Sequence, residues 1–157
     1  MHQYVIALGS NIRHHRHGVP RMVLRQALDT LARDMDVIAA SNIISSRPVG
    51  PSRREYANAA ALVASDLAPL TLLALLKEIE RHFGRRRGQR WGARVLDLDI
   101  ILWSGGRWQD KVLTIPHARF RDRAFVLGPA AAIAAHWRDP VSGKTLFQLF
   151  CYSARSR

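Results

Sequence analysis

The chain has 157 residues, of which 48% are hydrophobic, enough for one core and too many for a disordered protein. We therefore expect a single domain over residues 1–157. Lysine and arginine number 24 against 12 acidic residues, a formal net charge of +12, so an anionic partner is expected: a nucleotide, a nucleic acid or a membrane surface. Charge alone does not choose among these three.

The cysteine content and the lengths of the apolar runs indicate the cellular compartment of the protein. The single cysteine, Cys151, excludes an internal disulfide and any zinc site built on paired cysteines. Only five largely apolar residues precede Gly9, too few for a signal peptide, and the apolar run 124–135 contains Pro129 and is too short for a membrane span. We expect a cytoplasmic protein with no membrane partner.

Hydrophobic periodicity predicts alternating strands and helices in the first hundred residues. Residues 3–8 alternate as a strand, 19–33 carry one apolar helical stripe, and 36–46 return to β-branched and small residues. A loop with two prolines at 47–51 is followed by a strand over 56–65, a helix from Pro69 to Gly84 and a strand over 95–103. Gly105-Gly106 predicts a hairpin into 111–115.

This order is βαββαβ followed by a C-terminal extension. It is typical of the ferredoxin-like arrangement, an α+β fold in which helices pack on one face of an antiparallel sheet. No linker or repeat divides the chain, so motifs far apart in sequence can share one site.

Asp97 and Asp99 are the strongest candidates for chemistry. In a strand over 95–103 they share one face, roughly 6–7 Å apart along the strand, while Leu96, Leu98 and Ile100 share the other. Two such acids can simply face solvent from an open sheet. The arginines beside them favour another interpretation, a Mg²⁺ site that completes its coordination with phosphate oxygens and water.

The stretch 84–94 holds five arginines and no acidic residue. A solvated nucleic-acid patch is one interpretation. Glycines at 84, 88 and 92 favour a mobile loop whose guanidinium groups close over a polyphosphate, because a metal-nucleotide site needs both signs of charge together.

Two further groupings point to a flat, nitrogen-rich ligand and a nucleotide. Tyr56 and Asn58 point to the same side of their strand, which pairs a stacking ring with an amide, although a core tyrosine with a satisfied amide is equally compatible with the spacing. His117 stands before three alternating arginines and Phe125, a set that can line a nucleotide pocket.

Two other motifs give weaker indications of function. Gly143-Lys144-Thr145 looks like the end of a P-loop, but Arg138 stands where that motif needs its first glycine, so we expect a hairpin corner. His14, His15 and His17 are expected in a solvated loop.

Together these segments resemble the 6-hydroxymethyl-7,8-dihydropterin pyrophosphokinase family over about residues 4–129. The most specific stretch is residues 90–100, Arg-Trp-Gly-Ala-Arg-Val-Leu-Asp-Leu-Asp-Ile, followed by Leu113-Thr114-Ile115-Pro116-His117. The tripeptides at 9–11 (Gly-Ser-Asn), 49–51 (Val-Gly-Pro) and 56–58 (Tyr-Ala-Asn) support it in the expected order.

The resemblance implies transfer of a diphosphoryl group from ATP to the pterin alcohol, with release of AMP, in folate synthesis. It implies two Mg²⁺ ions on Asp97 and Asp99, and Arg85 and Arg94 on the polyphosphate. The nucleotide side would be formed by Leu73, Arg87, Trp91, Ile100, Thr114, His117, Arg121 and Arg123. The pterin side would be formed by Ser46, Pro48, Val49, Tyr56, Asn58 and Phe125. A monomer is expected, with no nucleic acid partner.

Four positions depart from the family pattern. They are Ala93 in place of proline, Ala118 in place of an aromatic residue, Lys77 in place of glutamine, and Val112 in place of a basic residue. These changes fall on the adenosine side more than on the acids that would hold metal.

Two alternatives stay open at this point. A ferredoxin-like RNA-binding module would need aromatic residues on the sheet face, where the alternation offers mostly alanine, valine and leucine. A two-metal nuclease or phosphatase would need further acidic ligands, for which Glu80 is the obvious nearby candidate.

Overall fold

The computed structural model describes residues 1–11, 18–46, 55–84 and 95–155. The main sheet contains β1 (His2–Ser10), β2 (Asp36–Ala40), β3 (Ile44–Ser46), β4 (Tyr56–Ser65) and β5 (Asp97–Trp103). The helices are α1 (Pro20–Asp34), α2 (Pro69–His82), α3 (Ala124–Ala134) and α4 (Leu146–Arg155), with a short 3-10 helix η1 (Phe120–Asp122) before α3. A separate hairpin is formed by β6 (Trp108–Gln109) and β7 (Thr114–Ile115).

The sheet is antiparallel, with the order β2-β4-β1-β5, and β3 pairs with the other end of β4. This order confirms the predicted ferredoxin-like fold. The predicted strand 36–46 is divided in two, because β2 shifts register between Val37 and Ala39 and Ser41 then bonds β4 through its side chain as well as its backbone. The Ala60 amide donates to the Ser41 hydroxyl at 2.9 Å.

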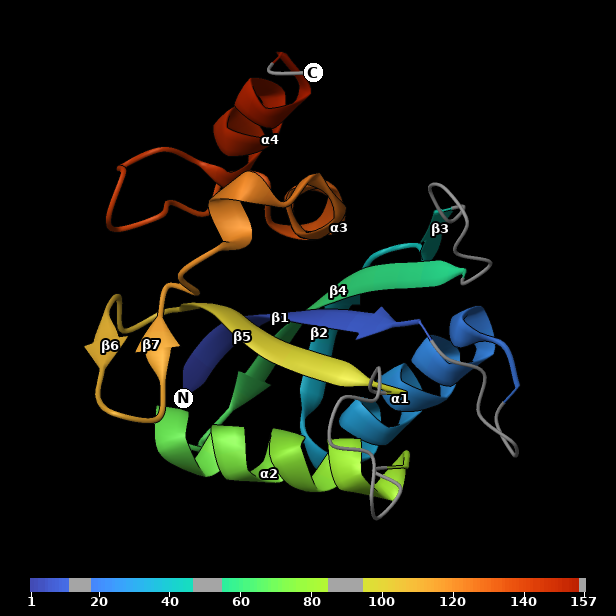
Figure 1. Ribbon diagram of the computed structural model, residues 1–157. Helices are drawn as coiled ribbons and strands as arrows, with labels where there is room; N and C mark the ends of the chain where they lie inside the picture. The colour runs from blue at the N-terminus through green and yellow to red at the C-terminus, as the bar shows by residue number, and fades with distance from the viewer. Residues whose placement is uncertain (12–17, 47–54, 85–94, 156–157) are drawn as a thin grey trace.

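The helices of the βαββαβ unit lie on one face of the sheet, as predicted (Figure 1). Even-numbered residues of β1 and odd-numbered residues of β4 point to this face and form the main core with α1 and α2. Tyr4, Leu24 and Leu72 are fully buried there. The apolar stripes seen in the sequence are therefore the inner faces of these helices.

The C-terminal extension covers part of the other face, so helices pack on both faces rather than on one (Figure 1). Val5 and Ala60 of the sheet, Phe120 of η1 and Leu127 of α3 belong to this second core, together with Leu146 of α4. The sequence prediction missed this arrangement, because α3 is apolar on nearly all sides and shows no stripe to orient it.

The hairpin predicted through Gly105-Gly106 differs in the structure. Gly106 forms a turn with φ of 96°, but the strands that pair afterwards are β6 and β7. Asp110 explains the difference, because its carboxylate accepts hydrogen bonds from the amides of Val112 (2.7 Å) and Leu113 (2.9 Å) and so makes the turn itself.

Gly143 lies in a turn with φ of 74°, between the bridged residues Arg138 and Thr145. This confirms the hairpin corner predicted for the sequence that looks like a P-loop. Within the described ranges, no helix has the length and apolar character needed to cross a bilayer.

Candidate active site

A row of residues crosses the sheet at one end, on the face opposite α1 and α2. Gly9 of β1 pairs with Asn58 on one side and with Asp97 on the other. Paired residues of an antiparallel sheet point to the same face, so Asp97 and Asn58 stand on either side of a residue without a side chain, their backbones roughly 10 Å apart. The row is therefore open in its middle.

Asp97 and Asp99 are turned to this face by simple alternation. Leu96, Leu98 and Ile100 are buried in the main core, while the two acids between them are partly exposed on the opposite face. Ala7, a small residue, pairs with Asp99 just as Gly9 pairs with Asp97. Both carboxylates thus project beside small neighbours, which leaves space for a ligand above the sheet.

The outer edge of β5 is held at two points. The Leu98 amide donates to Oε2 of the buried Glu80 at 3.3 Å, and the His117 amide donates to the carbonyl of Ile101 at 3.0 Å. Glu80 also pairs with Nζ of Lys77 at 3.1 Å. The strand that carries the acids is thus fixed to α2 and to the segment after β7.

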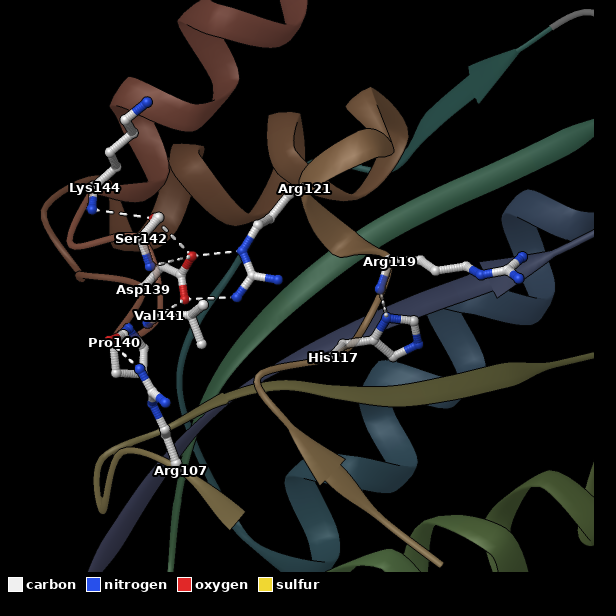
Figure 2. A network of polar contacts seen from close by, with 9 residues as sticks. All are labelled: Arg107, His117, Arg119, Arg121, Asp139, Pro140, Val141, Ser142 and Lys144. Carbon is white, nitrogen blue, oxygen red and sulfur yellow. Dashed lines mark hydrogen bonds and ion pairs between the residues drawn. The ribbon is translucent and has the colours of Figure 1, made fainter. Parts of the chain in front are cut away.

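His117 lies in the electrostatic field of Asp99. Burial lowers the pKa of His117, the Asp99 carboxylate opposes that shift, and Arg123 and Arg119 add to it. The ring Nδ1 accepts a hydrogen bond from the Arg119 amide at 3.1 Å (Figure 2). A neutral ring that accepts at Nδ1 carries its proton on Nε2, so His117 can donate to an anionic ligand.

The two aromatic residues predicted to stack on the pterin are both exposed. Tyr56 begins β4, two residues before Asn58, and is 40% exposed, and Phe125 in the first turn of α3 is 47% exposed. The Arg123 guanidinium lies 5.9 Å from the centre of the Phe125 ring. Exposed rings of this size suit the stacking of a flat heterocycle.

The donor set fits Mg²⁺. Two carboxylates offer the hard oxygen ligands that this ion prefers, and the described part of the chain contains no group of three or more histidine, cysteine, aspartate or glutamate ligands. An ion held by Asp97 and Asp99 would therefore draw its remaining ligands from water and from substrate oxygens, which is how Mg²⁺ is bound in phosphoryl-transfer sites.

The comparisons with known proteins decide the family. The model of the 7,8-dihydro-6-hydroxymethylpterin-pyrophosphokinase family matches residues 5–135. The chain belongs to this family. Membership makes it a pyrophosphokinase, an enzyme that transfers pyrophosphate to hydroxymethyldihydropterin in folate synthesis. The nuclease, phosphatase and RNA-binding alternatives are therefore set aside.

Relatives and solved structures agree with this family. A 2-amino-4-hydroxy-6-hydroxymethyldihydropteridine pyrophosphokinase of Synechocystis is 40% identical over 150 residues, covering 94% of this chain and 74% of its own. The Haemophilus influenzae protein of the same name is 39% identical over 133 residues, covering 83% and 80%. The HPPK-DHPS of Plasmodium falciparum with pteroate superposes with a TM-score of 0.76 at 13% identity, covering 98% of this chain and 45% of that one, and shows the fold alone.

The structure of this pyrophosphokinase brings together only some of the residues predicted for its site. Asp97, Asp99, Asn58 and Tyr56 share one face of the sheet, and His117 and Arg123 interact electrostatically beside Asp99. The remaining predicted residues Arg85, Arg87, Trp91, Arg94, Pro48 and Val49 lie outside the described residues, and of Ser46 only the backbone, paired with Tyr56, is described.

The structure also describes three other residues that were predicted to contact the nucleotide. The Ile100 side chain is buried in the main core, Leu73 packs partly against that core, and Thr114 is exposed on β7. Ile100 can therefore reach a ligand only through its backbone. The role of each residue on the adenosine side stays a prediction.

Arg121 is bound to an acid of the C-terminal extension, Asp139. Its guanidinium donates from Nε and Nη2 to the carboxylate of Asp139, so these two donors are already used within the protein (Figure 2). Its contact with nucleotide stays a prediction that this geometry does not favour.

Three residues that shape or support the site were not predicted from the sequence. The sequence indicates Gly9 only as part of the tripeptide 9–11, although a glycine inside an apolar strand signals close approach of another group. Glu80 was considered only as a metal ligand, and nothing in the sequence links Asp139 to Arg121, 18 residues before it.

Proposed function

We propose that the sheet face carrying Asp97, Gly9 and Asn58 is where this chain transfers a pyrophosphoryl group from ATP to 6-hydroxymethyl-7,8-dihydropterin. The observation that carries the proposal is the cross-strand row: an acid and an amide face the same open space on either side of a glycine. One end of the row suits phosphate chemistry, and the other suits recognition of a flat ring.

On the phosphate side, Asp97 and Asp99 would hold Mg²⁺, two ions in this proposal, which when bound neutralise charge on the ATP phosphates. His117 donates from Nε2 to a phosphate oxygen, and Arg123 adds positive charge beside it. Arg85 and Arg94 are proposed to contact the polyphosphate, with Arg87 and Trp91 nearby.

On the pterin side, Tyr56 and Phe125 stack against the two faces of the ring system in this proposal. Asn58 reads the edge of the ring, because its amide offers both a donor and an acceptor. Ser46, Pro48 and Val49 are proposed to complete the wall. This arrangement fixes the orientation of the hydroxymethyl group relative to ATP.

In the reaction, the hydroxyl oxygen of the pterin forms a bond to the β-phosphorus of ATP. The bond from that phosphorus to the oxygen bridging the α-phosphate breaks, AMP leaves with the bonding electrons, and the hydroxyl proton passes to water. No protein base is assigned, because loose phosphoryl transition states depend mainly on positioning and electrostatics. We also propose that the enzyme acts as a monomer in the cytoplasm.

The test uses purified protein with ATP, Mg²⁺ and hydroxymethyldihydropterin, and mass spectrometry to detect AMP and the pterin diphosphate. We expect AMP rather than ADP or free phosphate. Asp97→Asn should lower turnover by about a hundredfold or more. Asp66→Asn is the matched control, because Asp66 is an exposed acid just after the far end of β4, and it should change turnover less than about twofold. A folded Asp97→Asn variant with unchanged AMP production would contradict the proposal.

A further inference from the structure

The segment that carries His117 and Arg123 is clamped by an ion pair outside the site. The Asp139 carboxylate is completely buried and accepts two hydrogen bonds from Arg121, at 2.6 Å from Nε and 2.8 Å from Nη2 (Figure 2). Two parallel bonds to one carboxylate fix the direction of the guanidinium group as well as its distance. The pair therefore holds Arg121 in one orientation.

Asp139 is held in place by its own loop. Its carboxylate also accepts from the amides of Val141 (3.0 Å) and Ser142 (3.3 Å) and from the Ser142 hydroxyl (2.7 Å). Burial by itself would raise the pKa of Asp139, but the hydrogen bonds from Arg121, Ser142 and Val141 lower it to about 2. The carboxylate is thus charged and fully bonded at neutral pH.

The loop from Asp139 to Thr145 is fastened at several other points. The Asp139 amide donates to the carbonyl of Lys144, and the Gly143 amide donates to the carbonyl of Asp139, both at 2.8 Å. Arg107, just before β6, donates from Nη2 to the carbonyl of Pro140 at 3.1 Å. The loop therefore has several contacts besides those of Arg121, and it serves as the anchor for this side chain.

Arg121 connects this anchor to the site. It lies in η1, between His117 on one side and Arg123 on the other, and Phe120 beside it is fully buried in the second core. The Arg121 guanidinium lies 4.7 Å from the centre of the Phe120 ring, so the same side chain packs on η1 and bonds the anchor. The chain carries His117 and Arg119 before η1 and Arg123 after it, and His117 interacts electrostatically with Asp99 and with both arginines.

We propose that Asp139, acting through Arg121, is a positioning residue for the pyrophosphokinase reaction. It holds η1 so that His117 and Arg123 face the ATP phosphates. This inference rests on the proposed function, because it takes those two residues as nucleotide contacts. An apolar pair of similar volume would hold the extension equally well, so the directional ion pair suits a requirement for orientation.

The experiment compares three variants of the full chain. Arg121→Lys keeps the positive charge and loses the pair of parallel hydrogen bonds from the guanidinium group. Asp139→Asn keeps the shape of the side chain and loses its negative charge. The matched control is Arg138→Lys, because Arg138 donates to the Gly143 carbonyl in the same loop and has no bond to η1. Three quantities are measured: the Kd of a nonhydrolysable ATP analogue with Mg²⁺, the KM of the pterin, and the side-chain NMR cross-peak of His117 at one fixed pH without nucleotide.

We expect Arg121→Lys and Asp139→Asn to weaken binding of the ATP analogue by about fivefold or more, a loss typical of a misplaced charged contact. The KM of the pterin should change less than the affinity for the ATP analogue, because Tyr56 and Asn58 lie on β4 and only Phe125, at the start of α3, follows η1 in the chain. The His117 cross-peak should move in both variants and stay in place in Arg138→Lys.

Three results would overturn the proposal. These are unchanged affinity for the analogue in folded variants, equal losses for both substrates, or failure of both variants to fold, since the pair would then hold the whole domain. Failure of the proposed function gives a different pattern. In that case the wild-type protein releases no AMP, while the His117 cross-peak still reports whether the clamp holds η1.

Discussion

Replacement of Glu80 by methionine tests what holds the strand that carries the two acids. Among the described strands, β5 lies at the edge of the sheet and no strand pairs with its outer amides. Glu80 accepts the amide of Leu98 at 3.3 Å. Leu98 stands between Asp97 and Asp99. Methionine has a similar volume and helix propensity, so Glu80→Met removes the acceptor and the charge with little change in packing.

The expected cost follows from these contacts. A buried amide left without a partner costs about 1–3 kcal/mol, and the pair with the half-exposed Lys77 at 3.1 Å adds about 0–1 kcal/mol. For a chain of this size, about 2 kcal/mol corresponds to a fall in Tm of roughly 4–8 °C. Glu80→Gln keeps an acceptor oxygen and should lose less than about 1 kcal/mol.

The assay combines thermal unfolding with hydrogen exchange at the Leu98 amide. In Glu80→Met the Leu98 amide should exchange faster than in Glu80→Gln, and turnover should fall because the two acids lose their support. Equal Tm values for the two variants, together with unchanged exchange at Leu98, would show that Glu80 does not hold β5.

Two further predictions concern the glycine of the row and the buried acid of the extension. Gly9→Val should keep the fold, since Gly9 has no positive φ. Even a Cβ at this position lies 3.4 Å from Oδ1 of Asn58, so we expect the KM of the pterin to rise about tenfold or more. An unchanged KM of the pterin would contradict this prediction. Asp139 titrates near pH ~3.9 in an unfolded chain and at about 2 in the folded one, so its contribution of about 2–3 kcal/mol is complete above pH ~4 and is lost as the pH falls toward 2. The free energy of unfolding, measured with urea, should therefore fall more steeply between pH ~4 and ~2 in the wild type than in Asp139→Asn. An equal pH dependence of the free energy of unfolding in the two proteins would contradict the lowered pKa of Asp139.

Much of the fold was predictable because local periodicity and global topology agree. The strand predicted over 56–65 coincides with β4, and Pro69 begins α2 as expected. The hairpin after β5 was not predictable from its glycines, because the side chain of Asp110 decides where the chain turns. Turn chemistry of this kind depends on one side chain meeting two amides.

The site was predictable where it depends on alternation within a strand. Asp97, Asp99, Tyr56 and Asn58 needed only the two-residue period of a strand to be placed on a common face. The pairing of Arg121 with Asp139 could not be predicted in this way. It depends on how the extension folds back on the sheet, and α3 offers no polar face from which that orientation follows.

The helix α3 serves two surfaces at once. Its first turn presents Phe125 outward, while Val126, Leu127 and Ala130 directly after it fill the core beneath the extension. A change in the volume of those inner residues would tilt the helix and move the aromatic ring at its start. Substitutions far from any ligand can therefore shift the ring that we propose to stack on the pterin, and with it the substrate preference of the enzyme.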